Sequence, residues 1–366
     1  MPLLARHSAT RQPVAVEIAD GRVASVAPAA DAPDLPWIAP SFFDIQINGC
    51  LGRGFVSPDL TTADVRMIAD TCAAHGIGGF LPTLITNSFE TIRHGFTVLA
   101  RALDADADLA RRIPGFHLEG PYLSGEDGPR GAHPREHVRD PDWDEFQRWQ
   151  DAAGGRIRMV TVAPERAGAI PFIEKLATAG VVVAIGHTAA TGAQIRDAAR
   201  AGAKTSTHLG NGCHATMNRH ENVLWEQLAN DDLFASLITD GHHLPPAVVR
   251  CFLRMKGPRA LITCDAGNLA GLPPGRYREW GTELDVQPGG KIVVPGTPYL
   301  AGSGCFTDDC VRTVMAMTGI GLSEAIELAS VRPRELMGLP VPRLEVGQPA
   351  NFVLLDSETH RVVSQP

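Results

Sequence analysis

The chain has 366 residues, of which 44% are hydrophobic and 20% charged, and its formal net charge is −8. This composition is typical of a globular enzyme, and the length fits two average domains or one α/β barrel with a small companion. The acidic balance and the lack of any Lys/Arg cluster argue against a nucleic-acid surface. No apolar run approaches the roughly 18 residues that cross a bilayer.

The polar first residues, MPLLARHSATRQP, do not have the pattern of a signal peptide. The seven cysteines are scattered and form no C-x-x-C pair, which fits a reducing compartment better than a disulfide framework. We therefore expect a cytoplasmic protein that has neither a membrane nor a nucleic acid as its partner.

Both ends of the chain are predicted to be β-structure. Residues 14–27 form two short apolar segments joined at Asp20-Gly21, a strong hairpin signal. Near the other end, PANFVLLD and RVVS again have the pattern of strands. We expect residues 1–40 and 341–366 to form one small β-sandwich domain, and residues 41–340 to form the catalytic domain.

Between the two ends, short apolar segments rich in β-branched residues alternate with amphipathic helices. The clearest helix spans 62–75, where Val65, Ile68, Ala69 and Cys72 recur at helical spacing. The other expected helices are 88–103, 168–179, 191–201, 245–256 and 322–329. The expected strands are 42–47, 79–84, 113–118, 158–162, 181–186, 204–208, 234–239 and 260–264. Eight strands alternating with helices predict a (β/α)₈ TIM-like barrel, with a doubly wound sheet as the alternative.

Chemically active side chains stand where these strands end, and that face carries the active site in a β/α barrel. They are Gln46, Asn48, Glu119, His187, His208, Asp240, His243 and Asp265. One carboxylate and two imidazoles, those of Glu119, His187 and His208, suit a zinc-like ion with an open position for water. Such an ion lowers the pKa of its bound water to about 7. An acid placed like Asp265, after a fully apolar strand, suits a proton carrier.

Structural interpretations stay open for the same residues. Glu119 can cap a turn, His187 can cap the next helix, and His208 can be a core histidine. Asp240 and His243 lie in an Asp-Gly turn that is often structural. His133 lies in a loop, and spacing alone does not exclude the neighbouring His214, His220 and His242 as ligands.

Eight segments in a fixed order carry a family resemblance. They are FFDIQINGC, GFHLEGPYL, GAHP, IGHTAAT, THLGN, ITDGHHL, TCDA and LAGS. In this order they resemble the amidohydrolase superfamily and, within it, the N-acetylglucosamine-6-phosphate deacetylase family. The resemblance implies hydrolysis of the acetamide of N-acetylglucosamine 6-phosphate, or of a closely related N-acetylhexosamine phosphate. It also implies a barrel with a β domain from both termini, usually in a homodimer.

The resemblance assigns roles to the strand-end residues. Glu119, His187 and His208 would bind one divalent ion, zinc first, with Fe(II), Co and Mn as alternatives. Gln46 and Asn48 stand in place of the superfamily's His-x-His and would lie beside the ion without binding it. Asp265 would carry the proton from water to the leaving amine, and His133 would donate to the oxyanion.

The resemblance also assigns substrate contacts. Asn211, Gly212 and His243 match positions that hold the sugar and its phosphate, and Arg219 matches an arginine that reaches the phosphate of the neighbouring subunit. Arg and His suit a phosphate dianion as charged donors. The further expected substrate contacts are Ala132, Asp240 and Gly302.

The loop after His208 departs from the family pattern. Gly210 replaces an aromatic residue, Gly212 and Cys213 replace Ala-Met, and His214, Met217, His220 and Trp225 are additional. The reaction is therefore fixed more firmly than the substrate. The alternatives are an amidohydrolase that deacylates a different N-acyl amine or an unphosphorylated amino sugar, and a non-catalytic scaffold on the same barrel.

Overall fold

The computed structural model describes residues 2–279, 282–296 and 300–365. Its centre is an eight-stranded parallel sheet whose spatial order follows the chain. The strands are β5 (Phe42–Ile47), β8 (Ile77–Ile85), β9 (Phe116–Glu119), β10 (Ile157–Val162), β11 (Val182–Ile185), β12 (Ala203–Ser206), β13 (Phe234–Ile238) and β14 (Ala260–Thr263). A parallel bridge between Ile47 and Ala266 joins the last strand to the first. The (β/α)₈ barrel is thus confirmed, and the sequential strand order excludes a doubly wound sheet.

The barrel strands form because their residues are apolar on both faces. Strand β5 is buried along its whole length, as expected of a strand covered by helices outside and side chains inside. Phe43, Ile45, Leu81 and Met159 belong to one buried cluster with Leu336. Leu336 is the last residue of α11 (Arg332–Leu336), and Arg158, near the start of β10, donates to the carbonyl of the next residue, Met337. This cluster is therefore at the end of the barrel opposite the strand ends that carry the polar residues.

The barrel helices follow the expected pattern. Helix α1 (Thr62–Ala74) begins with a capping box between Thr61 and Asp64, and it buries the predicted stripe of apolar residues. The other expected helices are α2 (Phe89–Ala105), α5 (Ala169–Thr178), α6 (Gly192–Arg200), α8 (Pro246–Lys256) and α10 (Leu322–Ile326). Helix α10 continues through a π-helical turn, η3 (Glu327–Val331), into α11.

Several helices were not predicted because their apolar pattern is short or interrupted. They are α3 (Ala107–Arg112), α4 (Trp143–Ala152), α7 (Val223–Ala229) and α9 (Thr307–Thr318), with short 3₁₀ turns at η1 (Arg135–His137) and η2 (Gly257–Arg259). In α4 the buried residues are Glu145, Phe146 and Trp149, so a carboxylate interrupts the apolar face.

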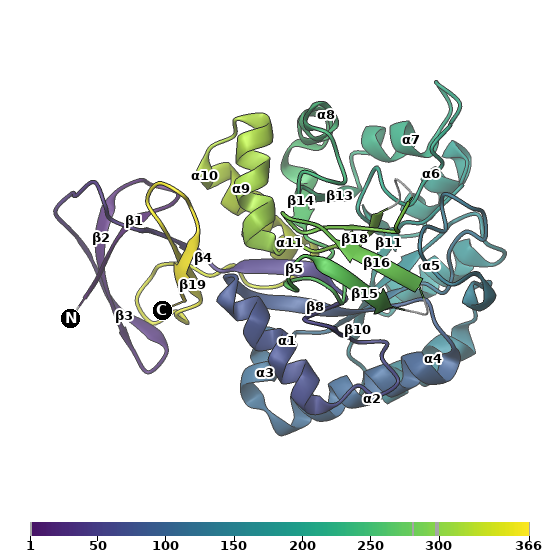
Figure 1. Cartoon of the computed structure of the whole chain (residues 1–366), viewed down its shortest axis with the longest axis horizontal. Helices are drawn as coiled ribbons and strands as arrows, with labels where there is room; N and C mark the ends of the chain where they lie inside the picture. Colours follow the sequence, from purple (N-terminus) through teal and green to yellow (C-terminus); the bar gives the residue numbers. More distant parts are fainter. Residues whose placement is uncertain (1, 280–281, 297–299, 366) are drawn as a thin grey trace.

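Both termini contribute to a second, six-stranded sheet. It comprises β1 (Leu3–His7), β2 (Pro13–Ala19), β3 (Arg22–Pro28), β4 (Trp37–Pro40), β19 (Phe352–Leu355) and β20 (Val362–Ser364). Figure 1 shows the purple N-terminal and yellow C-terminal strands side by side, next to the barrel. Asp20 and Gly21 both have positive φ, as a tight hairpin turn requires. The terminal β unit is thus one sheet with its own apolar cluster, and the domain boundaries at residues 40 and 341 stay a prediction.

A third, four-stranded antiparallel sheet follows the last barrel strand and was not predicted. It comprises β15 (Gly275–Glu279), β16 (Thr282–Val286), β17 (Lys291–Val293) and β18 (Leu300–Ser303). Its first strand is mostly exposed, so the segment has no apolar run that signals a strand. Strand β18 pairs with the barrel rim through a bridge between Ser303 and Ala266. A small two-stranded ribbon, β6 (Gly49–Cys50) with β7 (Arg53–Gly54), lies after β5.

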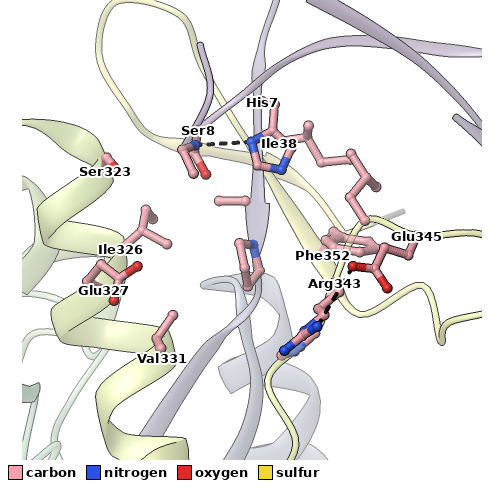
Figure 2. Close-up of a pocket in the computed structure, with 15 residues that line it drawn as sticks. His7, Ser8, Ile38, Ser323, Ile326, Glu327, Val331, Arg343, Glu345 and Phe352 are labelled. Atoms are coloured by element: carbon pink, nitrogen blue, oxygen red, sulfur yellow. Dashed lines mark hydrogen bonds and ion pairs between the residues drawn. The ribbon is translucent and has the colours of Figure 1, made fainter. Parts of the chain in front are cut away.

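A hollow of about 270 Å³ lies where the terminal sheet meets α10 and η3 (Figure 2). Its lining residues include His7, Glu327, Arg343 and Phe352, and none of them is a strand-end residue of the barrel. In the part of the chain that the structure describes, no helix is both long and apolar enough to span a membrane.

Candidate metal centre and active site

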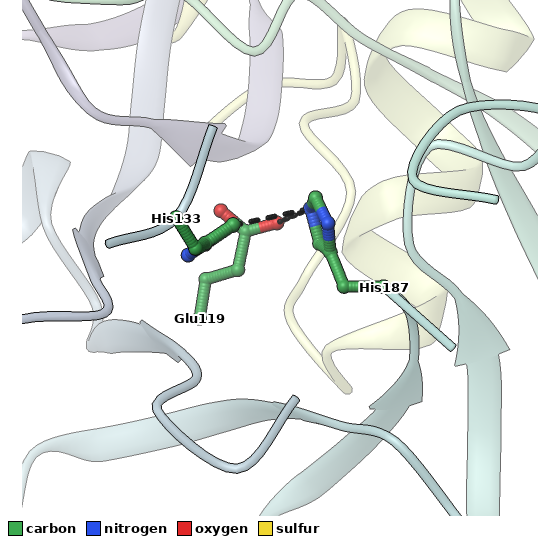
Figure 3. Close-up of side chains that lie close together, drawn as sticks. All are labelled: Glu119, His133 and His187. Atoms are coloured by element: carbon green, nitrogen blue, oxygen red, sulfur yellow. Dashed lines mark hydrogen bonds and ion pairs between the residues drawn. The ribbon is translucent and has the colours of Figure 1, made fainter. Parts of the chain in front are cut away.

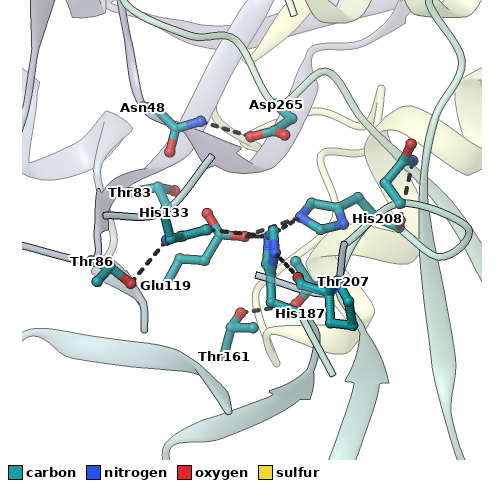
Figure 4. Close-up of polar contacts among 12 residues, drawn as sticks. Asn48, Thr83, Thr86, Glu119, His133, Thr161, His187, Thr207, His208 and Asp265 are labelled. Carbon is teal, nitrogen blue, oxygen red and sulfur yellow. Dashed lines mark hydrogen bonds and ion pairs between the residues drawn. The ribbon is translucent and has the colours of Figure 1, made fainter. Parts of the chain in front are cut away.

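Three predicted ligands converge at the carboxyl ends of β9, β11 and β12 (Figure 4). The Oε1 atom of Glu119 lies 3.1 Å from His208 Nε2 and 3.3 Å from His187 Nε2. The two Nε2 atoms are 3.0 Å apart. Ligand atoms that share one ion at bond lengths of about 2.0–2.2 Å lie about 3–3.5 Å from each other. This triangle therefore has the dimensions of a metal site.

A fourth donor, His133, lies at the same point (Figure 3). Its Nε2 atom is 3.2 Å from His187 Nε2, and the ligand atoms of Glu119, His133 and His187 all lie within 4.8 Å of one another. Its other ring nitrogen, Nδ1, is 2.8 Å from the hydroxyl of Thr86. The cluster thus holds one more donor than a three-ligand zinc site requires.

The hydrogen bonds around His187 fit metal binding. Its Nδ1–H donates to the carbonyl of Pro129 at 2.9 Å, so in the neutral ring Nε2 carries the lone pair. That lone pair faces the carboxylate of Glu119 and Nε2 of His208. An ionised Glu119 has no proton to donate to it, and neither has a His208 ring that lacks a proton on Nε2. A buried carboxylate with imidazole donors is a set that Zn, Fe(II), Co and Mn all accept. The residues present therefore fit one divalent cation.

The electrostatics of the cluster also favour a cation. Burial raises the pKa of Glu119, but the contacts of its carboxylate with His187 and His208 outweigh that effect and hold the pKa well below its usual range. Burial lowers the pKa of His208, yet the hydrogen bond and charge of Glu119 raise it overall. For His133, burial and the charge of His187 lower the pKa to about 3. The carboxylate charge is thus retained, and it would attract a cation bound among these side chains.

Asp265 lies opposite this cluster, after β14. Its Oδ1 accepts from the amide of Asn48 at 2.7 Å. Burial, and then the negative charge of Glu119, raise the pKa of Asp265 to about 7. Within the described ranges, Asn48 Oδ1 and both amide atoms of Gln46 are buried without a hydrogen-bond partner. A carboxylate poised near neutral pH is suited to accept and return a proton.

Asp240 and His243 form an ordered pair at the end of β13. The carboxylate accepts from His243 Nδ1–H at 2.7 Å and from the Ser303 hydroxyl at 3.2 Å. Its other oxygen accepts from the backbone amides of His242 and His243. Burial raises the pKa of Asp240, but the hydrogen bond and charge of His243 lower it to about 2. This pair fixes the orientation of the His243 ring.

The expected substrate residues occupy different parts of the rim. The Asn211 amide donates to the carbonyl of His208 at 3.2 Å. A Cβ atom at Gly212 would lie 2.8 Å from His187 Nδ1, so the backbone of this loop touches the ligand ring. Ala132 precedes His133 and is exposed, whereas Gly302 lies on β18 against the backbone of Gly267.

Arg219 does not join the cluster within one chain. It is exposed, and among the described residues its guanidinium makes no hydrogen bond or ion pair. Only its carbonyl is used, as the acceptor of the Trp225 indole N–H at 3.0 Å. The three further histidines also lie apart from the cluster: His214 contacts Glu126, His242 contacts the carbonyl of Gly289, and His220 is exposed.

Sequence reasoning missed the residues that support the cluster. Thr86 follows the second expected strand, so its strand-end position was a usable signal. Pro129, Asp44 and Ser303 carried no local signal, because their partners are distant in the sequence.

Comparisons with known proteins decide the family. No model of a protein family matches the chain. The chain is 32% identical to N-acetylgalactosamine-6-phosphate deacetylase of Escherichia coli O157:H7, over 94% of this chain and 91% of that protein. It is 33% identical to N-acetylglucosamine-6-phosphate deacetylase of Bos taurus, over 88% and 80% of the two chains. The chain belongs to the N-acetylglucosamine-6-phosphate deacetylase family.

A solved structure agrees with this membership over the whole fold. An N-acetyl-D-glucosamine-6-phosphate deacetylase variant from Mycobacterium smegmatis, in complex with N-acetyl-D-glucosamine-6-phosphate, superposes with a TM-score of 0.87. It is 34% identical, and the match covers 99% of this chain and 96% of that chain. The deacetylase resemblance that the eight sequence segments carried is thus confirmed.

Proposed function

We propose that the chain hydrolyses the acetamide of N-acetylglucosamine 6-phosphate, or of a closely related N-acetylhexosamine phosphate. The products are acetate and the amino sugar phosphate. The observation that carries this proposal is the Glu119–His187–His208 triangle with Asp265 across the same buried mouth. The E. coli relative is named for the galactosamine sugar and the bovine one for the glucosamine sugar, so both are candidate substrates.

Glu119, His187 and His208 would hold one divalent ion, with zinc the first expectation and Fe(II), Co and Mn the alternatives. When bound, such an ion supplies Lewis-acid activation of water and of the acetyl carbonyl. His133 has its Nε2 at the cluster and its Nδ1 at Thr86. If the Thr86 hydroxyl donates to Nδ1, then Nε2–H is the donor to the oxyanion of the tetrahedral intermediate.

Asp265 carries the proton through both halves of the reaction. Its Oδ1 is occupied by the Asn48 amide, which leaves Oδ2 to accept a proton from the attacking water. The same oxygen then returns that proton to the sugar nitrogen as the C–N bond breaks, so the amine leaves neutral. Asn48 orients the carboxylate, and Gln46 lies beside it without acting as a ligand.

The rim residues would recognise the sugar and its phosphate. Asn211, Gly212, Ala132 and Gly302 present amide or backbone groups, and the Asp240–His243 pair presents a fixed imidazole. In a homodimer, Arg219 would reach the phosphate of the neighbouring subunit. Its guanidinium is exposed and has no partner among the described residues, which supports this role, since a planar fork matches a phosphate. The homodimer and the cytoplasmic location stay predictions.

Metal removal and reconstitution test the proposal. We expect protein treated with a chelator to stop releasing acetate from N-acetylglucosamine 6-phosphate, and to recover with about one zinc ion per chain. Turnover that survives complete removal of metal would overturn the mechanism. Running N-acetylgalactosamine 6-phosphate beside it identifies the preferred sugar.

One observation favours a second candidate function, the deacylation of a different N-acyl amine or of an unphosphorylated sugar. Gly210 and Gly212 stand where the family has larger residues, so the loop after His208 presents a different wall to the substrate. Preference for an N-acyl compound without phosphate would establish this alternative.

A further inference from the structure

Three active-site residues share an unusual backbone conformation. The φ angles of His187, His208 and Asp265 are 49°, 31° and 51°. The left-handed region is disfavoured for residues with a Cβ atom, so it persists only where the surroundings hold it. All three lie directly after barrel strands, where a change of backbone direction moves the side chain into the mouth.

A carboxylate from the neighbouring strand end holds the segment after His187. Glu165, in the loop after β10, accepts from the backbone amide of Ala189 at 2.7 Å and from the Thr188 hydroxyl at 2.5 Å. Thr188 is buried, and its hydroxyl also accepts from the amide of Ala190. Glu165 therefore fixes the chain immediately beyond the ligand.

A hydroxyl from the next strand holds His208. The backbone amide of His208 donates to the Ser236 hydroxyl at 2.8 Å, and that hydroxyl donates to the carbonyl of Ser206 at 3.1 Å. Ser236 lies on β13 and is fully buried. One side chain thus bridges both sides of the turn that presents the ligand.

A buried acid on the first strand holds the segment before Asp265. Asp44, on β5, accepts from the backbone amide of Cys264 at 2.9 Å. It also accepts from the hydroxyls of Thr263 at 2.5 Å and Thr307 at 2.7 Å. These bonds join β5 to β14 and set the point from which Asp265 departs.

Residues with positive φ elsewhere are held differently. In the described ranges the other non-glycine examples are Arg11, Asp20, Leu51 and His360. The amides of Arg11, Leu51 and His360 donate to backbone carbonyls, those of His7, Ala270 and Asp356. Side chains also support the turns at Arg11 and His360, but they are those of His7 and Asp356 within the same turn. At the active-site mouth the supporting side chain comes from a different strand or from the loop after it.

We propose that Glu165, Ser236 and Asp44 are positioning residues of the active site. The first two set the directions of the ligand rings, and the third sets the direction of the proton carrier. The inference rests on the proposed function, because it presumes that His187 and His208 hold a metal. It predicts effects on metal affinity and coordination geometry that go beyond an effect on stability.

Ser236 gives the sharpest test. Ser236→Ala removes the hydroxyl, and Ser236→Thr keeps it. Thr205→Val removes another buried hydroxyl of the barrel, whose one hydrogen bond among the described residues is to the Ser206 carbonyl. Zinc affinity is measured by competition with a chromophoric chelator, and coordination geometry by the absorption spectrum of the Co(II) form. We expect Ser236→Ala to lose affinity by about 10- to 100-fold with a changed Co(II) spectrum. Thr205→Val and Ser236→Thr should stay within about threefold of the parent protein.

Variants of Glu165 and Asp44 distinguish the positioning of a metal ligand, His187, from the positioning of the proton carrier, Asp265. Glu165→Ala should weaken zinc binding as Ser236→Ala does, and Glu165→Gln, which keeps one acceptor oxygen, should weaken it less. Asp44→Asn should retain zinc but lower kcat, because Asp44 bonds the segments that carry Asp265 and Gln46, and neither residue is an expected metal ligand. If an alanine variant fails to melt cooperatively without metal, Glu165→Gln decides the result: zinc affinity and a Co(II) spectrum equal to those of the parent would overturn the positioning role.

The outcomes are distinguishable. Zinc affinity and Co(II) spectra unchanged in folded Ser236→Ala and Glu165→Ala would overturn the positioning role and leave the proposed function intact. Absence of metal binding by the parent protein would overturn both.

Discussion

The metal cluster of Glu119, His187 and His208 and the loop after His208 differ in burial and in the number of polar contacts. Glu119 and His208 are 2% and 3% exposed, and each lies within a network of short polar contacts. Along residues 215–222 most side chains are exposed, and Trp225 beyond them is 54% exposed. Figure 1 shows the loop that leads into α7 projecting from the barrel. A hollow of about 550 Å³ separates this loop from the start of α6.

This contrast explains why the catalytic groups match the family resemblance while the loop after His208 does not. A buried cluster of hydrogen-bonded groups tolerates few substitutions, because a change at one partner leaves the other polar group unpaired. An exposed loop has no such constraint and is where substrate recognition changes most easily. The chain accordingly keeps every catalytic group of the family resemblance and departs from it in residues 210–225.

The largest effect on metal content and activity is expected from a change in the metal cluster. Glu119→Gln replaces the only carboxylate of the metal cluster, so we expect metal content to fall to background and turnover to become undetectable. Metal analysis and acetate release measure both. Glu136→Gln, an exposed residue of the loop that follows His133, is the matched control and should retain metal and activity.

Asp265→Asn should separate chemistry from metal binding. We expect kcat to fall by about 10²–10⁴-fold, because proton transfer is lost while the Asn48 contact and the ligands remain. Metal content should stay at the parent level. Normal turnover by this variant would show that another group carries the proton.

The exposed loop should affect binding more than chemistry. For Arg219→Ala we expect KM for the phosphorylated sugar to rise by about 10- to 100-fold, since a charge-assisted hydrogen bond is lost. The kcat value should change little, and an unphosphorylated sugar should show no difference. Arg254→Ala, an exposed arginine on α8, serves as the control; an equal effect there would remove the specific role of Arg219.

The smallest effect concerns stability. Asp240 has a folded-state pKa of about 2, below the ordinary value of about 3.9, so its contribution is present above pH 4 and lost as pH falls toward 2. Asp240→Asn should therefore lower the free energy of unfolding by about 1–2 kcal/mol at pH 7. Urea titrations of metal-free protein at several pH values should show that the difference in the free energy of unfolding between the parent and Asp240→Asn becomes smaller below pH 4. A difference that does not depend on pH would mean that it does not come from the charge on Asp240.

Features that arise from residues near one another in the sequence could be predicted, and features that depend on contacts between distant segments could not. The barrel strands and α1 were predictable because burial leaves a local apolar pattern. The meeting of Glu119, His187, His208 and Asp265 at one end of the barrel was predictable because each stands at or just beyond the end of such a strand, and their roles stay predictions. The β15–β18 sheet was missed because its exposed first strand carries no such pattern. Thr86, Glu165 and Ser236 act across strands, so their roles become visible only when distant segments are brought together.

The proposed function is tested most directly by free-amine release from zinc-reconstituted protein, with N-acetylglucosamine 6-phosphate and N-acetylglucosamine run side by side. We predict turnover of the phosphorylated sugar with a kcat/KM at least about 100-fold above that of the free sugar, a difference of about 2.8 kcal/mol. Equal turnover of both would contradict the phosphate role of Arg219 and His243. Turnover of neither sugar, by protein that holds one zinc ion, would contradict the proposed substrate.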